Sequence, residues 1–147
     1  MSSGYVYDDG GREAAGFKGE AGDCVVRAIA IAAEKPYKEV YDELGTLVKA
    51  EKVTKQTPKK GVSARDGVYK KTFQNYLVDL WWKWVPTMIF GQGCTVHLSA
   101  DELPGGRLIV SVSKHLTTMI DGVIHDTHDP RRETGRCVYG YFYKPAR

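Results

Sequence analysis

Three side chains in this sequence have the types needed for nucleophilic catalysis: Cys24, His115 and Asp126. Cys24 stands at the start of an apolar segment that predicts a buried helix, and the positive end of a helix dipole favours a thiolate over a thiol. Backbone N–H groups at the same helix end can stabilise a developing oxyanion. A histidine that takes the thiol proton, oriented by a carboxylate, would complete a site for attack on a carbonyl.

One turn signal predicts that His115 and Asp126 are neighbours. Asp121-Gly122 is the strongest hairpin signal in the chain, and a two-residue turn there places residue 117 opposite residue 126. Because side chains alternate along a strand, Asp126 then shares a face of the sheet with His115, whereas Asp129 lies on the opposite face. His115 and Asp126 become diagonal neighbours within reach of each other. Four residues are expected on this face: 115, 117, 126 and 128.

The other two cysteines offer one rival nucleophile. Cys94 follows Gly91-Gln92-Gly93 and has a nearby amide side chain, but it precedes a predicted strand and lacks a helix dipole. Cys137 begins a predicted strand and is expected in the core. Three cysteines are an odd, sparse set, which argues against a disulfide scaffold and favours a reducing compartment, so we expect a cytoplasmic protein. In the simplest alternative, Cys24 is itself a buried structural cysteine, since such cysteines are common and usually inert.

The elements that would position these side chains are helices followed by strands. Residues 1–22 are rich in glycine and predict a flexible arm before a single domain of residues 23–147. Asp23 is a good N-cap for the apolar helix, and Pro36 follows its end. Apolar residues at helical spacing predict a second helix from Pro36 to about Ala50 and a third from Asp66 to about Leu80. Six segments predict strands: 83–90, 94–98, 107–112, 115–120, 123–127 and 137–143.

This order of elements predicts an α+β fold, with the Cys24 helix packed on a C-terminal antiparallel sheet. The 147 residues are enough for one domain, and 42% hydrophobic and 27% charged residues are typical of a globular chain. No apolar run approaches the roughly 20 residues of a bilayer span, and the first residues show no secretory signal, so no membrane association is expected. A net charge of +3 does not by itself imply a nucleic-acid partner.

Two short motifs resemble the papain-like cysteine peptidases. Gly22-Asp23-Cys24-Val25-Val26-Arg27-Ala28 is similar to their nucleophile helix, and the segment from Lys114 to Thr127 is similar to their histidine strand, turn and third-residue strand. Within this superfamily, the sequence resembles small bacterial and phage proteins of this fold, which are related to C39-like and NlpC/P60-like peptidases. The resemblance covers the layout of roughly residues 17–143. It implies a papain-like fold with Cys24 as nucleophile, His115 as base and Asp126 as orienting acid, and with no cofactor or metal.

One departure from the family's pattern concerns the oxyanion hole. Papain-like peptidases usually carry a glutamine a few residues before the nucleophile, and no glutamine or asparagine occurs between residues 1 and 55. A backbone amide or one of three side chains would supply the second donor: Lys18, Tyr5 or Tyr7. Asp23, beside the thiol, opposes thiolate formation unless it caps the helix instead. Arg27, one turn after Cys24, is expected to pair with Asp23 or a distant acid, or else to hold a substrate carboxylate.

Two binding functions are alternatives to catalysis. Four residues have side chains of the types that bind zinc: Cys94, His97, His125 and His128. Their spacing counts against a zinc site, because residues three apart on a strand point to opposite faces of the sheet. The stretch from Lys49 to Lys71 has a net charge of +6 and precedes three tryptophans, Trp81, Trp82 and Trp84, which together suggest a groove for single-stranded nucleic acid. A solvated basic loop followed by a core aromatic strand is the simpler interpretation, so a nucleic-acid partner is not expected.

The function favoured by the residues and the resemblance together is that of a cysteine peptidase or amidase. It would act on a peptide or protein substrate by hydrolysis or acyl transfer through a thioester on Cys24. The alternative is a catalytically inactive papain-like interaction module that binds or inhibits a host protein. Reactivity of the Cys24 thiol distinguishes these two functions.

Overall fold

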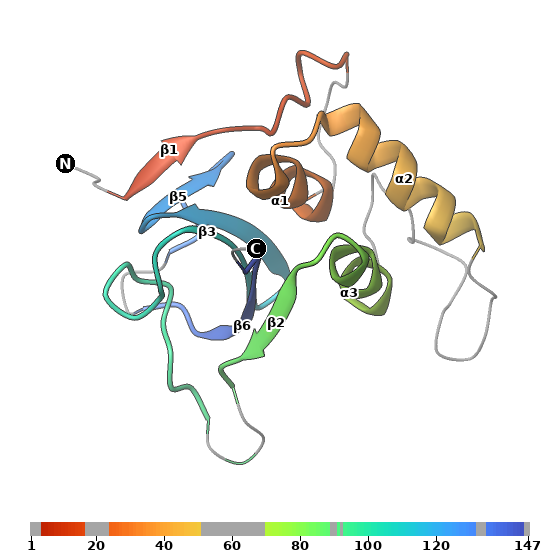
Figure 1. Cartoon of the computed structure of the whole chain (residues 1–147). Helices are drawn as coiled ribbons and strands as arrows, with labels where there is room; N and C mark the ends of the chain where they lie inside the picture. Colours follow the sequence, from red (N-terminus) through yellow and green to blue (C-terminus); the bar gives the residue numbers. More distant parts are fainter. Residues whose placement is uncertain are drawn as a thin grey trace.

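The computed structural model of the chain describes residues 4–16, 24–50, 70–88, 91, 93–131 and 135–145. Within these residues, three helices and one six-stranded mixed sheet form an α+β fold (Figure 1). The helices are α1 (Cys24–Ala33), α2 (Tyr37–Ala50) and α3 (Lys70–Asp79). The strands are β1 (Tyr5–Tyr7), β2 (Lys83–Pro86), β3 (Arg107–Val112), β4 (His115–Ile120), β5 (Val123–Asp126) and β6 (Val138–Tyr143). Across the sheet they lie in the order β1-β5-β4-β3-β6-β2.

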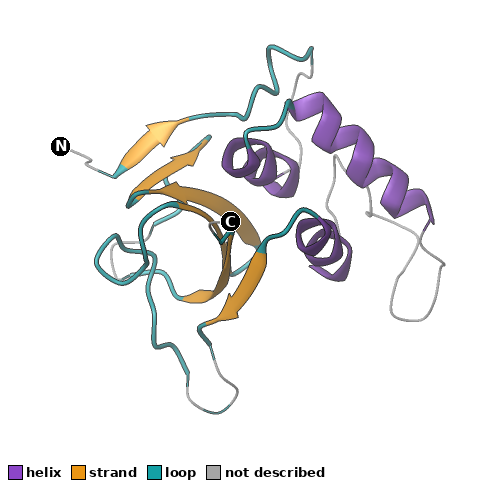
Figure 2. Cartoon of the chain, viewed as in Figure 1, coloured by secondary structure: helices purple, strands orange, loops and turns teal. Residues whose placement is uncertain are grey.

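Helix α1 lies between the sheet and α2, and the three helices gather on one side of the curled sheet (Figure 2). Helix α1 has apolar side chains on nearly all of its faces, and its residues Val26 and Ile29 have no exposed surface. A helix that is apolar on most faces is stable only when most faces are covered, which the sheet and α2 together achieve. None of the described helices, α1 included, is long and apolar enough to cross a membrane.

The sheet separates two apolar cores. On one face, Ile109 and Leu116 pack with the helices. On the other face, Leu108 and Met119 pack under the loop that contains residues 98–103. Both faces of β3 and β4 are therefore covered, so the start of β4, where His115 lies, is held by packing from two sides.

Two strand side chains fix α1 on the sheet. Thr118 Oγ1 donates to a carbonyl in the middle of α1 at 2.7 Å. Arg107 donates from Nε to the carbonyl of Ala32 at 2.9 Å and from Nη2 to that of Ile31 at 2.8 Å. Carbonyls in the last turn of a helix have no partner within it, and Arg107 supplies one. These bonds fix α1 against β3 and β4 and thereby fix the place of its first residue, Cys24.

From α1 onward the helices precede the strands, as predicted, and β3 and β4 have the predicted bounds. Helix α2 covers the predicted second helix, apart from Pro36 at its start. Residues 70–79 of the third predicted helix are helical, whereas residues 66–69 lie outside the described part of the chain. Asp23, the expected N-cap of α1, also lies outside it.

Three expectations about the sheet are wrong. It is mixed rather than antiparallel, because Tyr5–Tyr7, from the arm predicted to be flexible, pair in parallel with β5. Residues 94–98 form no strand, and within them only His97 makes an isolated bridge, to Cys137. The strand predicted over residues 83–90 ends at Pro86 as β2, because the amides of Thr87 and Met88 both donate to the carbonyl of Tyr139 and so leave the regular strand pairing.

Candidate active site

The β4–β5 hairpin has the predicted turn and register. Asp121 and Gly122 have φ angles of 49° and 82°, both left-handed, as in the tight turns that an Asp-Gly pair favours. The strands pair from residue 120 opposite 123 to residue 118 opposite 125. The predicted pairing of residue 120 with 123 is therefore confirmed, and the same register leads on to Thr117 and Asp126, whose side chains are hydrogen-bonded.

His115 and Asp126 are joined by a hydrogen bond across this hairpin. His115 Nε2 lies 2.7 Å from Asp126 Oδ2, and Thr117 Oγ1 donates to the same oxygen at 2.6 Å. The amide of Thr127 donates to Oδ1 at 2.7 Å. Asp126 is only 4% exposed, and a buried carboxylate needs donors of this kind. Because Nε2 faces the carboxylate, Nδ1 is the ring nitrogen that is left for a second partner.

That second partner is Cys24, the first residue of α1. Its half-buried thiol lies close enough to His115 for that side chain to lower the pKa of the thiol, and the backbone N–H of Leu116, the next residue along β4, acts in the same direction. The N-terminus of α1, the start of β4 and the end of β5 therefore meet at one place. The structure thus brings Cys24, His115 and Asp126 together, with a hydrogen bond between the imidazole and the carboxylate and the thiol beside the imidazole.

Each of the three groups favours the charged form of its neighbour. Burial alone would raise the pKa of the Cys24 thiol, but the hydrogen bond and the charge of His115 outweigh burial and lower this pKa. Burial acts to lower the pKa of His115, yet the bonds to Asp126 and Cys24 raise it to about 9. Burial acts to raise the pKa of Asp126, and the bonds from His115 and Thr117 lower it overall. The contacts among the three groups thus favour a thiolate, an imidazolium and a carboxylate together.

Strand β1 holds Asp126 from the edge of the sheet. Tyr7 pairs with Asp126, and the amide of Asp8 donates to the Asp126 carbonyl at 2.9 Å. The hydroxyl of Tyr5 donates to the same carbonyl at 3.2 Å. The sequence analysis missed this support, although the run Tyr5-Val6-Tyr7 consists of residues that favour strands.

The side chains suggested for the second oxyanion donor do not meet at the thiol. The hydroxyl of Tyr5 already donates to Asp126, and Tyr7 is 64% exposed on the edge strand. Lys18 lies outside the described residues. The first amides of any helix have no partner within it, so a backbone amide near Cys24 is the donor that fits best.

Asp129 pairs with Arg131 rather than with His115. Arg131 Nε and Nη2 donate to the two oxygens of Asp129 at 2.9 and 2.7 Å, and this contact lowers the pKa of Asp129. His128 lies on the face predicted for it, with its ring centroid 5.0 Å from that of His115. Asp126, and not Asp129, is therefore the acid beside the imidazole, as the hairpin register predicts.

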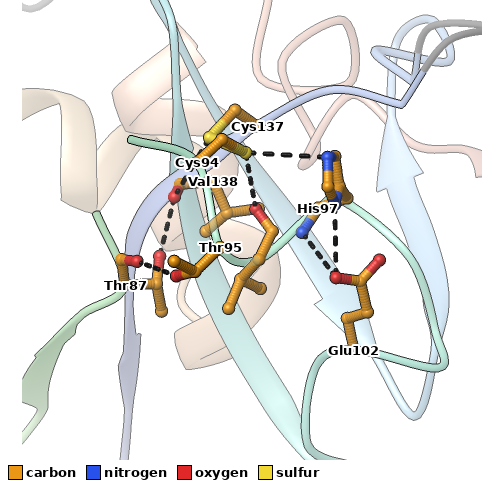
Figure 3. Close-up of a disulfide and its surroundings, with 8 residues drawn as sticks. Thr87, Cys94, Thr95, His97, Glu102, Cys137 and Val138 are labelled. Atoms are coloured by element: carbon orange, nitrogen blue, oxygen red, sulfur yellow. Dashed lines mark hydrogen bonds and ion pairs between the residues drawn. A yellow bond between two sulfur atoms is a disulfide. The ribbon is translucent and has the colours of Figure 1, made fainter. Parts of the chain in front are cut away.

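The other two cysteines form a disulfide, which the sequence analysis did not expect (Figure 3). Cys94 and Cys137 are bonded across 43 residues of sequence, with Cα atoms 5.8 Å apart. Cys94 has no free thiol in this state and is excluded as a rival nucleophile. The expectation of reduced cysteines is wrong in this structure, so the argument for a cytoplasmic location loses its basis.

The four residues considered as zinc ligands do not converge. Cys94 Sγ lies 3.6 Å from His97 Nε2, so these two do meet, but Cys94 is bonded to Cys137. His125 and His128 lie elsewhere, against Asp8 and His115. Figure 3 shows His97 between Cys94 of the disulfide and Glu102, with His97 Nδ1 3.3 Å from Glu102 Oε1. No group of three or more metal-binding side chains occurs in the described parts of the chain.

The three tryptophans do not form one surface. Trp82 is 3% exposed in the helical core, and Trp84 packs against Phe142 with ring centroids 4.7 Å apart. Trp81 is 69% exposed. The expectation of core aromatic residues is thus confirmed for Trp82 and Trp84, while residues 51–69 of the basic stretch lie outside the described residues.

Comparisons of the chain with models of protein families, with curated proteins and with solved structures find no match. The papain-like resemblance therefore stays a prediction, and inference of function rests on the geometry of Cys24, His115 and Asp126.

Proposed function

We propose that this chain is a papain-like cysteine peptidase or amidase that acts on peptide or protein amides through Cys24, His115 and Asp126. One observation carries the proposal: at the start of a buried helix, the Cys24 thiol lies beside an imidazole that is hydrogen-bonded to a buried carboxylate. The thiolate is the nucleophile in this chemistry, and the surroundings of Cys24 favour the thiolate.

In the proposed reaction, Cys24 Sγ attacks the carbonyl carbon of the amide. Its proton resides on Nδ1 of His115, because Nε2 is bonded to Asp126. Backbone N–H groups at the start of α1 donate to the carbonyl oxygen as it becomes an oxyanion. His115 then gives its proton to the leaving amine, the C–N bond breaks, and a thioester to Cys24 remains.

The second half of the reaction releases the acyl group. Water attacks the thioester carbon while His115 accepts its proton, and the thiolate of Cys24 leaves to pair again with the imidazolium. An acceptor amine in place of water would make the same site a transferase. Asp126 remains ionised throughout and orients the ring, and its bonds from Thr117 and Thr127 hold it in place.

Labelling with thiol electrophiles, followed by peptide mapping, tests this proposal. We expect iodoacetamide at neutral pH to modify Cys24, while Cys94 and Cys137 stay protected as long as the protein is not reduced. The Cys24→Ser variant is the matched control and should take up no label.

Two outcomes would change the assignment. If Cys24 reacts in the unfolded protein but resists the same reagent in the folded one, the inactive interaction module becomes the better account. If Cys24 is labelled but no thioester to it forms with any peptide in a library, detected as a mass increase that Cys24→Ser lacks, the thiol is activated for another purpose.

A further inference from the structure

Arg27 lies beside the carboxylate of the candidate active site, one turn after Cys24 on the same helix. Its Nη2 atom is 3.9 Å from Asp126 Oδ1, and the two side chains are only 12% and 4% exposed. An arginine is always charged in proteins, so a fixed positive charge stands on the far side of Asp126 from His115 Nε2, which bonds the other oxygen.

The reactive form of the site needs this second positive charge. A thiolate at Cys24 and a carboxylate at Asp126 carry two negative charges, whereas the imidazolium of His115 carries one positive charge. The three groups together therefore have a net charge of about −1. An excess charge in a largely buried site is costly, because little water is present to solvate it. With Arg27 included, the four groups are electrically neutral.

We propose that Arg27 is a positioning residue of the active site, which balances the charge of Asp126 and so keeps the thiolate–imidazolium pair formed at lower pH. The proposal rests on the proposed function of Cys24, His115 and Asp126. The positive charge of Arg27 also acts directly on the nucleophile, because Arg27 is one of the groups that lower the pKa of Cys24. The preferred sequence-based expectation, that Arg27 pairs locally or with a distant acid, agrees with this role.

The other charged groups that face the site from the described elements do not replace Arg27. On β1, the pKa of Tyr5 is raised by burial and by nearby acids, so the phenol is neutral, and Asp8 approaches His125. After β5, Asp129 is neutralised by Arg131. His128 contacts the ring of His115 and is present in every variant compared below, so its contribution cancels.

The pH dependence of Cys24 alkylation in Arg27→Met tests the proposal. The acid limb of the rate profile should move up by about one pH unit, because an opposing charge at this range shifts a pKa by roughly one to three units at the group it contacts and by less at a neighbour. Arg27→Lys keeps the charge and should restore most of the shift. Lys38→Met is the matched control: it removes a positive charge that pairs with Asp42 on the exposed side of α2 and should leave the acid limb where it is.

Folding of each variant is checked by circular dichroism across the pH range. If Arg27→Met does not fold, Arg27→Gln, which keeps hydrogen-bond donors but no charge, must give the same shift. A profile of the neutral variant that superimposes on that of the native protein overturns the role of Arg27. So does a shift that Arg27→Lys does not reduce, because it would reflect packing rather than charge.

The same data separate this proposal from the proposed function. If the function is wrong, native Cys24 titrates as an ordinary thiol, there is no displaced acid limb to move, and the role of Arg27 falls with it. If only the role of Arg27 is wrong, the native limb is present at low pH and stays there in all variants.

Discussion

Asp126→Asn is expected to lower the rate of peptide hydrolysis by about two to four orders of magnitude while the protein stays folded. Asp126 accepts hydrogen bonds from His115 and Thr117 on one oxygen and from the Thr127 amide on the other. An asparagine would direct its NH₂ group against one of these donors. It also removes the negative charge that helps to raise the pKa of His115, so a smaller fraction of Cys24 would be thiolate at neutral pH.

Asp129→Asn is the matched control, because it removes the other acid after the hairpin. Asp129 bonds to Arg131 on the surface and does not face the imidazole, so we expect little change in rate. Steady-state rates of both variants with one fluorogenic peptide decide between them. If Asp129→Asn is the damaging change, the assignment of the orienting acid is wrong. If neither matters, a Cys–His pair without an acid is the better account.

His115→Ala is expected to slow alkylation of Cys24 by about 10²-fold at pH 6. An ordinary thiol with a pKa of about 8.5 is less than roughly one per cent thiolate at that pH, whereas the imidazolium lowers the pKa of the native thiol and so raises its thiolate fraction. The acid limb of the rate profile should disappear and leave a single inflection near or above the ordinary thiol pKa. Timed iodoacetamide labelling from pH 5 to 10 measures both effects.

His125→Ala is the control for the loss of a hairpin histidine. His125 is on β5 but approaches Asp8 rather than the thiol, so its profile should match that of the native protein. An unchanged profile in His115→Ala would mean that Cys24 and His115 do not interact in solution, and the papain-like interpretation would then be abandoned.

The relation between His115 and Asp126 could be predicted because it is local. Two residues with left-handed φ angles at Asp121-Gly122 fix a tight turn, and the turn fixes the register of every following pair. The place of Cys24 could be predicted in part, because an apolar helix of that length must be buried against the sheet. Which strand its first residue would meet depends on Thr118 and Arg107, which no local pattern marks as partners of α1.

The features that sequence analysis missed are contacts between distant segments. Strand β1 pairs with β5, some 120 residues later, and its three residues are too few to give a periodic pattern. The disulfide joins Cys94 to Cys137, and cysteine number alone cannot show which pair comes within bonding distance. The contact of Arg27 with Asp126 also depends on how the α1 start packs on the sheet.

The pH dependence of Cys24 alkylation in the native protein tests the central claim most directly, namely that Cys24 and His115 form an ion pair. The lowered pKa of Cys24 predicts an acid limb below the ordinary thiol value of about 8.5, and the raised pKa of His115 predicts a second inflection near pH 9, where the imidazolium loses its proton. A single inflection at about 8.5 or above, with no limb on the acid side, would contradict the claim and identify Cys24 as an ordinary thiol.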